Sequence, residues 1–422
     1  MSEAENKKLF DERLKRMQDA AALKEPDRVP ILEPGTNTFP YMDAGYTMAE
    51  ILYDLEKTKD AIRKYLLKYE VDCGHTFASC LEGQGPMLEK SKSKVFEWAG
   101  MQGGIPDKNS IHQFKEFPTL LEDEFGELTT DLSSFIATKY LPRVYGIFEP
   151  MKSLKFTNSL AWSGGFAYLE VASFFAQAEV QGMIKTLVEL HGMWMNYLDN
   201  MKTFAVEVEA MGFPLITGAP TLATFDIYSD LLRGTMGAST DLYDSPDEVY
   251  EFLCEFNKKT IEKIKAGPAQ PGRFAFIPMH KGMDGFLSDE HYRKFYWEHL
   301  YQVILAFIET GMIPYVYTEG KYTTRMKYLK ELPKGKTVVH FEDVDMAYAK
   351  KELKDIACIA GNFPAHLLFS GTKQQVVDET KRLLDICAPG GGYIFDFDGG
   401  MYQSKSENVE ALFDTIKTYG KY

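Results

Sequence analysis

The chain has 422 residues, 45% of them hydrophobic and 26% charged, so it can bury a large core and is not a disordered protein. Its 61 acidic and 47 basic residues give a net charge of −14, which argues against nucleic acid as the main partner. No segment approaches the roughly 20 apolar residues of a membrane span, and the first residues lack the apolar core of a signal peptide. The five cysteines are scattered and form no Cys-x-x-Cys pair. We therefore expect a reduced, cytoplasmic enzyme.

The N-terminal part predicts a helical arm followed by the first elements of a larger domain. Apolar residues recur at helical spacing over residues 5–23, which indicates an amphipathic helix. We expect an arm over residues 1–24 and a single barrel domain over 25–422. The next elements are a short buried strand, a second amphipathic helix and another strand, at residues 28–32, 47–69 and 71–78.

The middle of the chain predicts a helical insertion in the N-terminal half. Residues 105–212 show mostly helical patterns, with hydrophobic stretches around 162–175 and 183–211. A strand is predicted at 213–217 and a helix at 246–266.

The C-terminal half repeats one pattern five times: an apolar run, a polar or glycine-rich turn, and a helical segment. Continuous apolar runs indicate strands covered on both faces, as in a parallel sheet. With the three earlier strands there are eight, so an α/β fold of the (β/α)8 TIM barrel type is predicted ahead of a doubly wound sheet. A doubly wound sheet would favour a Gly-x-Gly-x-x-Gly turn after its first strand, and none is present. The runs are 274–279, 313–317, 337–340, 357–360 and 392–395, with helices expected at 289–310, 323–331, 344–353, 373–387 and 405–420.

Polar residues follow each of these predicted strands, where a barrel places its active site. They are His280, Lys281 and Asp284; Thr318, Glu319 and Lys321; His340, Glu342, Asp343 and Asp345; Asn362 and His366; and Asp396 and Asp398.

Two histidines and a glutamate from neighbouring strand ends have the composition of a zinc site with nitrogen and oxygen ligands. Glu319 and His340 lie one βα unit apart, and His280 one unit earlier is the natural third ligand. A fourth position open to water or substrate would make such a site catalytic. The alternative is that each histidine is a hydrogen-bonded core residue and that the carboxylates after His340 cap the next helix.

Several segments resemble the uroporphyrinogen decarboxylase superfamily. They are Asp27-Arg-Val-Pro30, Ala360-Gly-Asn-Phe-Pro-Ala-His-Leu-Leu-Phe-Ser-Gly-Thr372, Gly390-Gly-Gly-Tyr-Ile-Phe395, Glu407-Asn-Val-Glu-Ala-Leu412 and the closing Tyr-Gly-Lys-Tyr. The resemblance covers roughly residues 213–422. It implies a (β/α)8 barrel and either porphyrinogen decarboxylation or cobalamin-dependent methyl transfer.

Both activities have motifs from which this sequence departs. The decarboxylase carries an arginine-rich segment, Met-Arg-Gln-Ala-Gly-Arg, after its first strand, whereas residues 33–42 contain no arginine. The methyltransferases carry a His-x-Cys-Gly zinc motif, whereas this chain has Tyr317-Thr-Glu-Gly320. The resemblance to related demethylases, which bind zinc through carboxylates and histidine, implies that Glu319 and His340 hold zinc, with His280 as the candidate for the third ligand. Such an oxygen-rich site would polarise an ether or alcohol oxygen.

The first hypothesis is therefore a methyltransferase that moves a methyl group from a small O-methyl substrate to the corrinoid of a separate protein. Glu319, His340 and Asp226 are the predicted catalytic residues, and a homodimer is left open as the assembly. The second hypothesis is a cofactor-free decarboxylase using Asp226, Tyr228, Arg233 and His280. The third is a non-catalytic barrel that binds a tetrapyrrole or a corrinoid. The predicted substrate-binding residues are Tyr228, Arg233, Lys281 and Asn362.

Overall fold

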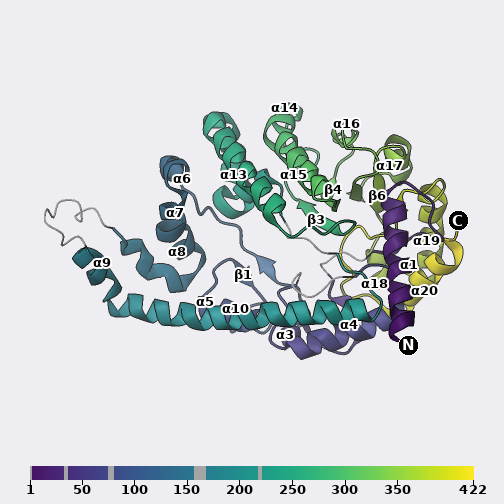
Figure 1. Ribbon diagram of the computed structural model, residues 1–422, viewed down its shortest axis with the longest axis horizontal. Coiled ribbons are helices and arrows are strands. Elements are labelled where there is room, and N and C mark those ends of the chain that lie inside the picture. Colours follow the sequence, from purple (N-terminus) through teal and green to yellow (C-terminus); the bar gives the residue numbers. More distant parts are fainter. Residues whose placement is uncertain (1, 33–36, 75–79, 156–167, 217–220) are drawn as a thin grey trace.

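A parallel sheet surrounded by helices forms one part of the molecule, and a helical lobe extends to one side of it (Figure 1). The computed structural model describes residues 2–32, 37–74, 80–155, 168–216 and 221–422. The sheet has five strands in the order β3-β4-β5-β6-β7, which confirms the five predicted runs. The strands are β3 (Phe274–Met279), β4 (Ile313–Lys321), β5 (Val338–Asp343), β6 (Cys358–Gly361) and β7 (Tyr393–Ile394).

Isolated parallel bridges continue the sheet beyond β7 and mark the three remaining predicted strands. The bridges join Ile31 with Phe395, Leu32 with Cys73, and Gly74 with Leu215. The predicted strands at 71–78 and 213–217 are described only in part, because residues 75–79 and 217–220 lie outside the described residues. Within the described ranges no pairing joins Leu215 to β3. The fold is the predicted (β/α)8 barrel class.

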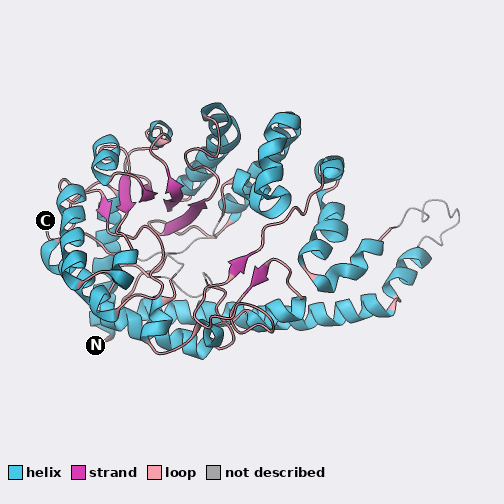
Figure 2. Ribbon diagram, turned by 180° about the vertical axis from the view of Figure 1, so that it is seen from behind, coloured by secondary structure: helices cyan, strands magenta, loops and turns pink. Residues whose placement is uncertain are grey.

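Helices cover the outer side of the sheet (Figure 2). Side chains of the strands are buried on both faces, which explains the continuous apolar runs in the sequence. The helices are α11 (Thr224–Asp226), α12 (Gly234–Asp244), α13 (Pro246–Ala266), α14 (Asp289–His291), α15 (Glu298–Glu309), α16 (Met326–Leu329), α17 (Met346–Leu353), α18 (His366–Ser370), α19 (Lys373–Cys387) and α20 (Ser406–Tyr419), with π-helical segments at Ile227–Arg233 and Tyr292–Trp297.

The predicted N-terminal helix α1 (Glu3–Ala21) closes the amino-terminal end of the barrel. Its Met17, Ala20 and Ala21 pack with residues at the starts of the strands, including Phe274 and Val338. An ion-pair network around the buried Asp72 ties the helix to the barrel: Arg16 pairs with Asp27 and Asp72, and Arg28 also pairs with Asp72. The helix does not cover the opposite end of the barrel, where the strands end. Barrel enzymes have their active sites at that end.

The predicted helix at 47–69 is divided in two. Asp54 accepts hydrogen bonds from the amides of Glu56 and Lys57 and so begins a new helix. The helices of this region are α2 (Phe39–Asp43), α3 (Met48–Ile51) and α4 (Leu55–Tyr69).

The predicted helical insertion forms the lobe. Its longest element is α10 (Ala178–Ala210), which runs along one edge of the molecule (Figures 1 and 2). Residues 162–167 of one predicted hydrophobic stretch lie outside the described residues. The other elements are α5 (Gly85–Ser91), β1 (Phe96–Glu97), β2 (Gln113–Phe114), α6 (Phe125–Thr130), α7 (Leu132–Phe135), α8 (Leu141–Val144) and α9 (Tyr168–Phe175), with short helical turns at Glu122–Glu124, Ile136–Tyr140 and Gly146–Ser153. None of the described helices combines the length and apolar character of a membrane span.

Candidate active site

A cavity of about 440 Å³ opens where β3 and β4 end. It gathers three of the predicted site residues: His280 and Lys281 directly follow β3, and Glu319 lies near the end of β4. Its lining is Phe114, Glu116, Asp230, His280, Lys281, Met283, Glu319 and Gly320.

His280 lies between two carboxylates in this cavity. Its Nδ1 is 2.6 Å from Oδ2 of Asp230, and its Nε2 is 3.6 Å from Oε1 of Glu319. The second distance is too long for a hydrogen bond. The His280 side chain is 30% exposed, so the Nε2 edge of the ring is accessible from the cavity.

The surrounding charges hold His280 as an imidazolium. Burial alone would lower its pKa, but the hydrogen bond to Asp230 and the charges of Glu319 and Asp226 outweigh burial and raise the pKa to about 9. Burial also raises the pKa of Glu319, although the positive charge of His280 opposes this rise. At neutral pH His280 therefore has a proton on both ring nitrogens.

Asp226, predicted to be catalytic, lies fully buried beneath the cavity. Its two carboxylate oxygens accept hydrogen bonds of 2.9 Å from the backbone amides of His280 and Lys281, and Tyr296 donates its hydroxyl at 2.8 Å. Burial raises the pKa of Asp226 to about 6, against the lowering effect of the His280 charge. Asp226 thus fixes the backbone that carries His280 and does not line the cavity itself.

Lys281, predicted to bind substrate, is paired with carboxylates. Its Nζ lies 3.3 Å from Asp230 and 3.4 Å from Glu116, and it donates a hydrogen bond of 2.9 Å to Thr235. Both cations in the described lining, His280 and Lys281, are already paired with carboxylates. The described lining therefore offers no unpaired cation to an anionic substrate.

A bulge in β4 orients Glu319. The register with β5 shifts between Thr318 and Lys321, so that β4 contains one more residue than β5 over this stretch. Gly320 has a positive φ of 83°, and its amide donates a 2.6 Å hydrogen bond to the Glu342 carboxylate. Glu342 therefore anchors the bulge. It does not cap the next helix, whose first turn is capped by Asp345.

His340 lies inside the barrel, away from this pair. Its ring stacks on Tyr317 with centroids 3.8 Å apart, and its Nε2 donates a 2.7 Å hydrogen bond to the carbonyl of Phe397. Complete burial lowers the pKa of His340 to about 3, so the ring is neutral, and its Nδ1 has no hydrogen-bond partner in the described structure. The structure thus brings together two of the three predicted metal ligands, His280 and Glu319, and gives His340 other contacts.

The three predicted ligands, as they lie, do not fit a zinc site. Nδ1 of His280 is held by Asp230, and Nε2 of His340 is held by the carbonyl of Phe397 inside the barrel. Among the described residues, no group of three or more His, Cys, Asp or Glu side chains is arranged to hold a metal ion.

Tyr228 and Arg233, predicted to bind substrate, belong to a buried network. Arg233 makes two hydrogen bonds to Asp241, of 2.6 and 2.9 Å, and a third to the carbonyl of Leu120. The Tyr228 hydroxyl also donates to Asp241. Both side chains thereby hold the helices next to the cavity together.

Asn362, the remaining predicted substrate-binding residue, contacts the backbone. Its amide donates 3.0 Å hydrogen bonds to the carbonyls of Glu342 and Val344. Asn362 therefore fixes the loop after β5.

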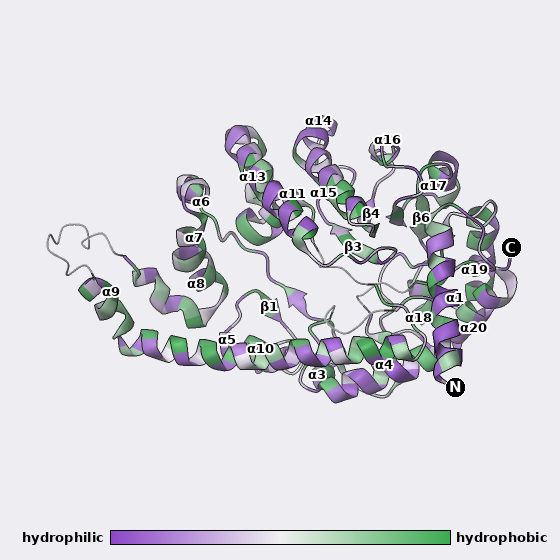
Figure 3. Ribbon diagram, in the orientation of Figure 1, coloured by the Kyte–Doolittle hydropathy of each residue, from purple (hydrophilic) through white to green (hydrophobic). Residues whose placement is uncertain are grey.

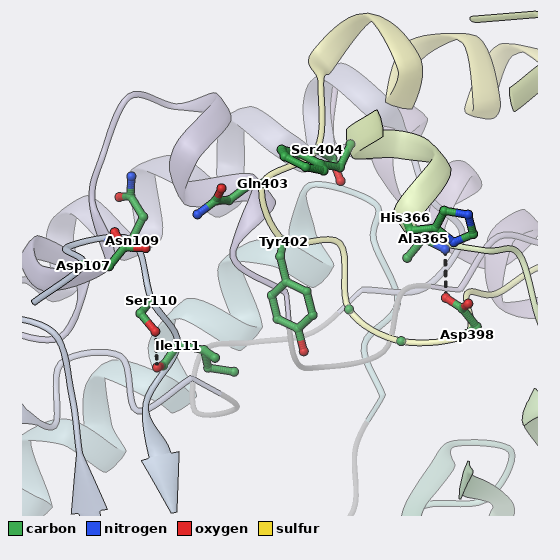
Figure 4. Close-up of a pocket in the computed structure, with 13 residues that line it drawn as sticks. Asp107, Asn109, Ser110, Ile111, Ala365, His366, Asp398, Tyr402, Gln403 and Ser404 are labelled. Atoms are coloured by element: carbon green, nitrogen blue, oxygen red, sulfur yellow. Dashed lines mark hydrogen bonds between the residues drawn. The ribbon is translucent and has the colours of Figure 1, made fainter. Parts of the chain in front are cut away.

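A second cavity, of about 550 Å³, lies between residues 107–111 and the loops that follow β6 and β7 (Figure 4). Asp398 accepts a hydrogen bond from the Ala365 amide there, and Tyr402 points into the space between the two sides. The cavity contains none of the predicted catalytic, metal or substrate-binding residues.

Asp230 and Glu116 are the site residues that the sequence analysis missed. Asp230 follows Asp226 by four residues, which is one helical turn. This spacing could have predicted that both carboxylates lie on the same face of one helix. Glu116 lies 165 residues before Lys281, and no local pattern connects them.

Comparison with known proteins identifies related sequences and folds. The family model for uroporphyrinogen decarboxylase (URO-D) matches residues 199–419, just over half of the chain. A solved structure, a methyltransferase from Methanosarcina mazei, superposes with a TM-score of 0.58 and 12% sequence identity, covering 96% of this chain and 98% of that one. At that identity the likeness is one of fold. The search of curated proteins gave no match.

Proposed function

The chain belongs to the uroporphyrinogen decarboxylase family, and from this membership we propose that it is a methyltransferase acting on a small O-methyl substrate in the His280 cavity. The observation that carries the proposal is the His280 imidazolium, held by Asp230 at Nδ1 and accessible at Nε2. The methyltransferase with a similar fold supports this branch of the family.

An imidazolium suits methyl transfer from oxygen because the leaving group needs a proton. As a nucleophile attacks the methyl carbon, the carbon–oxygen bond breaks and its electron pair stays on oxygen. His280 donates its Nε2 proton to that oxygen, which releases an alcohol and leaves a neutral imidazole. Solvent then returns the proton. Asp230 keeps Nδ1–H oriented throughout.

The acceptor of the methyl group is proposed to be the corrinoid of a separate protein, as the resemblance implied. The cavity opens at the carboxyl end of the barrel, where such a partner can approach. No step of the proposed mechanism uses zinc, because His280, Glu319 and His340 do not form a suitable ligand set.

Charge distinguishes this proposal from porphyrinogen decarboxylation. A porphyrinogen carries many carboxylates and needs unpaired cations to hold them. Arg233 is engaged by Asp241, and Lys281 by Asp230 and Glu116. A neutral methyl ether or alcohol places no such demand on the cavity.

The test is a methyl-transfer assay with cob(I)alamin as the acceptor and a panel of methyl ethers and methanol as donors. Formation of methylcobalamin is followed by its visible absorption. We expect donor-dependent transfer by the wild-type protein and a roughly 10²- to 10⁴-fold lower rate in the His280→Gln variant, the range that general acid catalysis supplies. His291→Gln is the matched control, because His291 packs against Tyr243 and Phe295, outside the cavity.

Two results would overturn the proposal. Formation of coproporphyrinogen from uroporphyrinogen in an anaerobic incubation would support the decarboxylase hypothesis. Binding of hydroxocobalamin or a porphyrin without turnover in either assay would support the non-catalytic barrel.

A further inference from the structure

The second cavity, between residues 107–111 and the loops after β6 and β7, has the size of a small-molecule site. Its volume of about 550 Å³ falls within the range of about 300–1,000 Å³ that such sites occupy. The two loops follow neighbouring parallel strands at their carboxyl ends, which is the end of a barrel where ligands bind. The cavity shares no described lining residue with the His280 cavity, so it can hold a ligand of its own.

The described lining of this cavity is acidic. It contains two carboxylates, Asp107 and Asp398, and neither a lysine nor an arginine. Asp107 accepts a hydrogen bond from the backbone amide of Asn109. Asp398 accepts one of 2.8 Å from the backbone amide of Ala365. Within the described structure neither carboxylate forms an ion pair. The lining therefore repels an anionic ligand and attracts a cationic one.

Asp398 is the carboxylate that gains most from a cationic ligand. Burial raises the pKa of Asp398, although the Ala365 amide and the charge of His366 oppose this rise. The surroundings thus compensate only part of the cost of burying the negative charge. An ammonium group beside Asp398 would supply the rest through a charge-assisted hydrogen bond.

Two aromatic side chains line the same cavity. Phe369 is 56% exposed and Tyr402 is 43% exposed. Tyr402 points into the space between the two sides of the cavity (Figure 4). The face of an aromatic ring carries partial negative charge and attracts cations. Accessible rings next to a carboxylate without an ion pair suit a ligand that combines a positive charge with an apolar body.

We propose that this cavity binds a small organic ammonium ion. The charged nitrogen of the ligand lies against Asp398, and its apolar part lies against Tyr402 and Phe369. Because the cavity is separate from the one that contains His280, this inference does not rest on the proposed methyl transfer.

Isothermal titration calorimetry of the full-length protein at neutral pH tests the proposal with three probes of nearly the same shape. The probes are benzylammonium, benzyl alcohol and benzoate, which are positive, neutral and negative. We expect benzylammonium to bind at least about tenfold more tightly than benzyl alcohol, and benzoate to bind most weakly. Equal affinity for benzylammonium and benzyl alcohol would overturn the proposal, and so would the absence of benzylammonium binding.

Variants of the lining locate the bound probe. Asp398→Asn removes the charge but can still accept the hydrogen bond from the Ala365 amide, so the loop after β7 should keep its shape. This variant should bind benzylammonium at least about tenfold more weakly and benzyl alcohol as wild type does. Tyr402→Leu and Phe369→Leu remain apolar without a ring, and each should lower the preference for benzylammonium over benzyl alcohol about two- to fivefold.

Two controls exclude binding elsewhere on this acidic protein. The helices around the barrel carry hydrophilic as well as hydrophobic residues (Figure 3), so a cation could bind loosely to their carboxylates. Asp414→Asn, on an exposed position of α20, controls for such binding. Glu116→Gln controls for the His280 cavity, which Glu116 lines. Both variants should bind benzylammonium as wild type does. Loss of binding in either control, or unchanged binding in Asp398→Asn, would overturn the proposal because the cation would then lie elsewhere.

Discussion

Oδ2 of Asp230 lies 2.6 Å from Nδ1 of His280, and this contact decides which nitrogen faces the cavity. Asp226 supports the same histidine from below by binding its backbone amide. The two carboxylates are one helical turn apart, so a single helical segment sets both the position and the charge of the ring.

Replacing Asp230 with asparagine is expected to shift the pH dependence of methyl transfer. Since His280 acts as an acid with a raised pKa, activity is present below about pH 9 and is lost as pH rises through that value. Asp230→Asn removes a negative charge and should move this alkaline limit down by roughly one to three pH units. The pH–rate profile measures the shift, and an NMR titration of His280 measures it without activity. An unchanged His280 pKa would contradict the assigned role of Asp230.

Replacing Arg233 with methionine is expected to reduce stability because the buried Asp241 carboxylate would lose its cation and keep only the hydrogen bond from Tyr228. Breaking such a buried pair costs about 3–5 kcal/mol in the free energy of unfolding. The side chains of Arg233 and Asp241 are only 5% and 6% exposed. Urea denaturation measures the loss. A variant that keeps full stability but binds substrate weakly would instead support the substrate-binding role predicted from the sequence.

Arg382→Met is the matched control for this measurement. Arg382 is 54% exposed and pairs with Glu379 on the same helix. Exposed pairs contribute about 0–1 kcal/mol, so the control should lose little stability.

The strands were predictable because burial on both faces of the barrel leaves continuous apolar runs in the sequence. The same reasoning placed His280, Lys281 and Glu319 at strand ends, and the structure gathers them in one cavity. His340 follows the same rule but its side chain packs inside the barrel on Tyr317, and the strand position alone does not reveal this.

Long-range partners account for most of what the sequence did not reveal. Arg233 was assigned to substrate, but its side chain binds Asp241, eight residues along the chain, and the carbonyl of Leu120, 113 residues earlier. The contact with Leu120 depends on how the lobe meets the barrel, and so does the contact of Glu116 with Lys281. Local patterns contain no information about such contacts.

The resemblance-based prediction of zinc can be tested by metal analysis. Because the three predicted ligands do not form a suitable set, we expect wild-type protein and Glu319→Ala to have the same zinc content after purification. Mass spectrometry of the dissolved metal gives the zinc per chain, and dialysis against zinc followed by gel filtration is the control for metal lost in purification. Stoichiometric zinc in wild type that disappears in the variant would restore Glu319 as a ligand.

Replacing Glu342 with glutamine is expected to stabilise the protein at alkaline pH. Burial raises the pKa of Glu342 to about 7 from a usual value near 4.5, even though the Gly320 amide favours the carboxylate. A carboxyl group with a raised pKa holds its proton longer in the folded state than in the unfolded state. Its contribution to stability is therefore present at low pH and is lost as pH rises from about 4.5 to 7.

Glutamine stays neutral and can still accept the hydrogen bond from the Gly320 amide. At pH 8 the free energy of unfolding of the Glu342→Gln variant should therefore exceed that of wild type by up to about 3 kcal/mol, because each pKa unit corresponds to 1.36 kcal/mol. At pH 4.5 the two should be nearly equal. Glu342→Leu removes the acceptor as well and should speed hydrogen exchange at Gly320, because the bulge that orients Glu319 loses its anchor. Equal exchange at Gly320 in the leucine and glutamine variants would show that the bulge does not depend on Glu342.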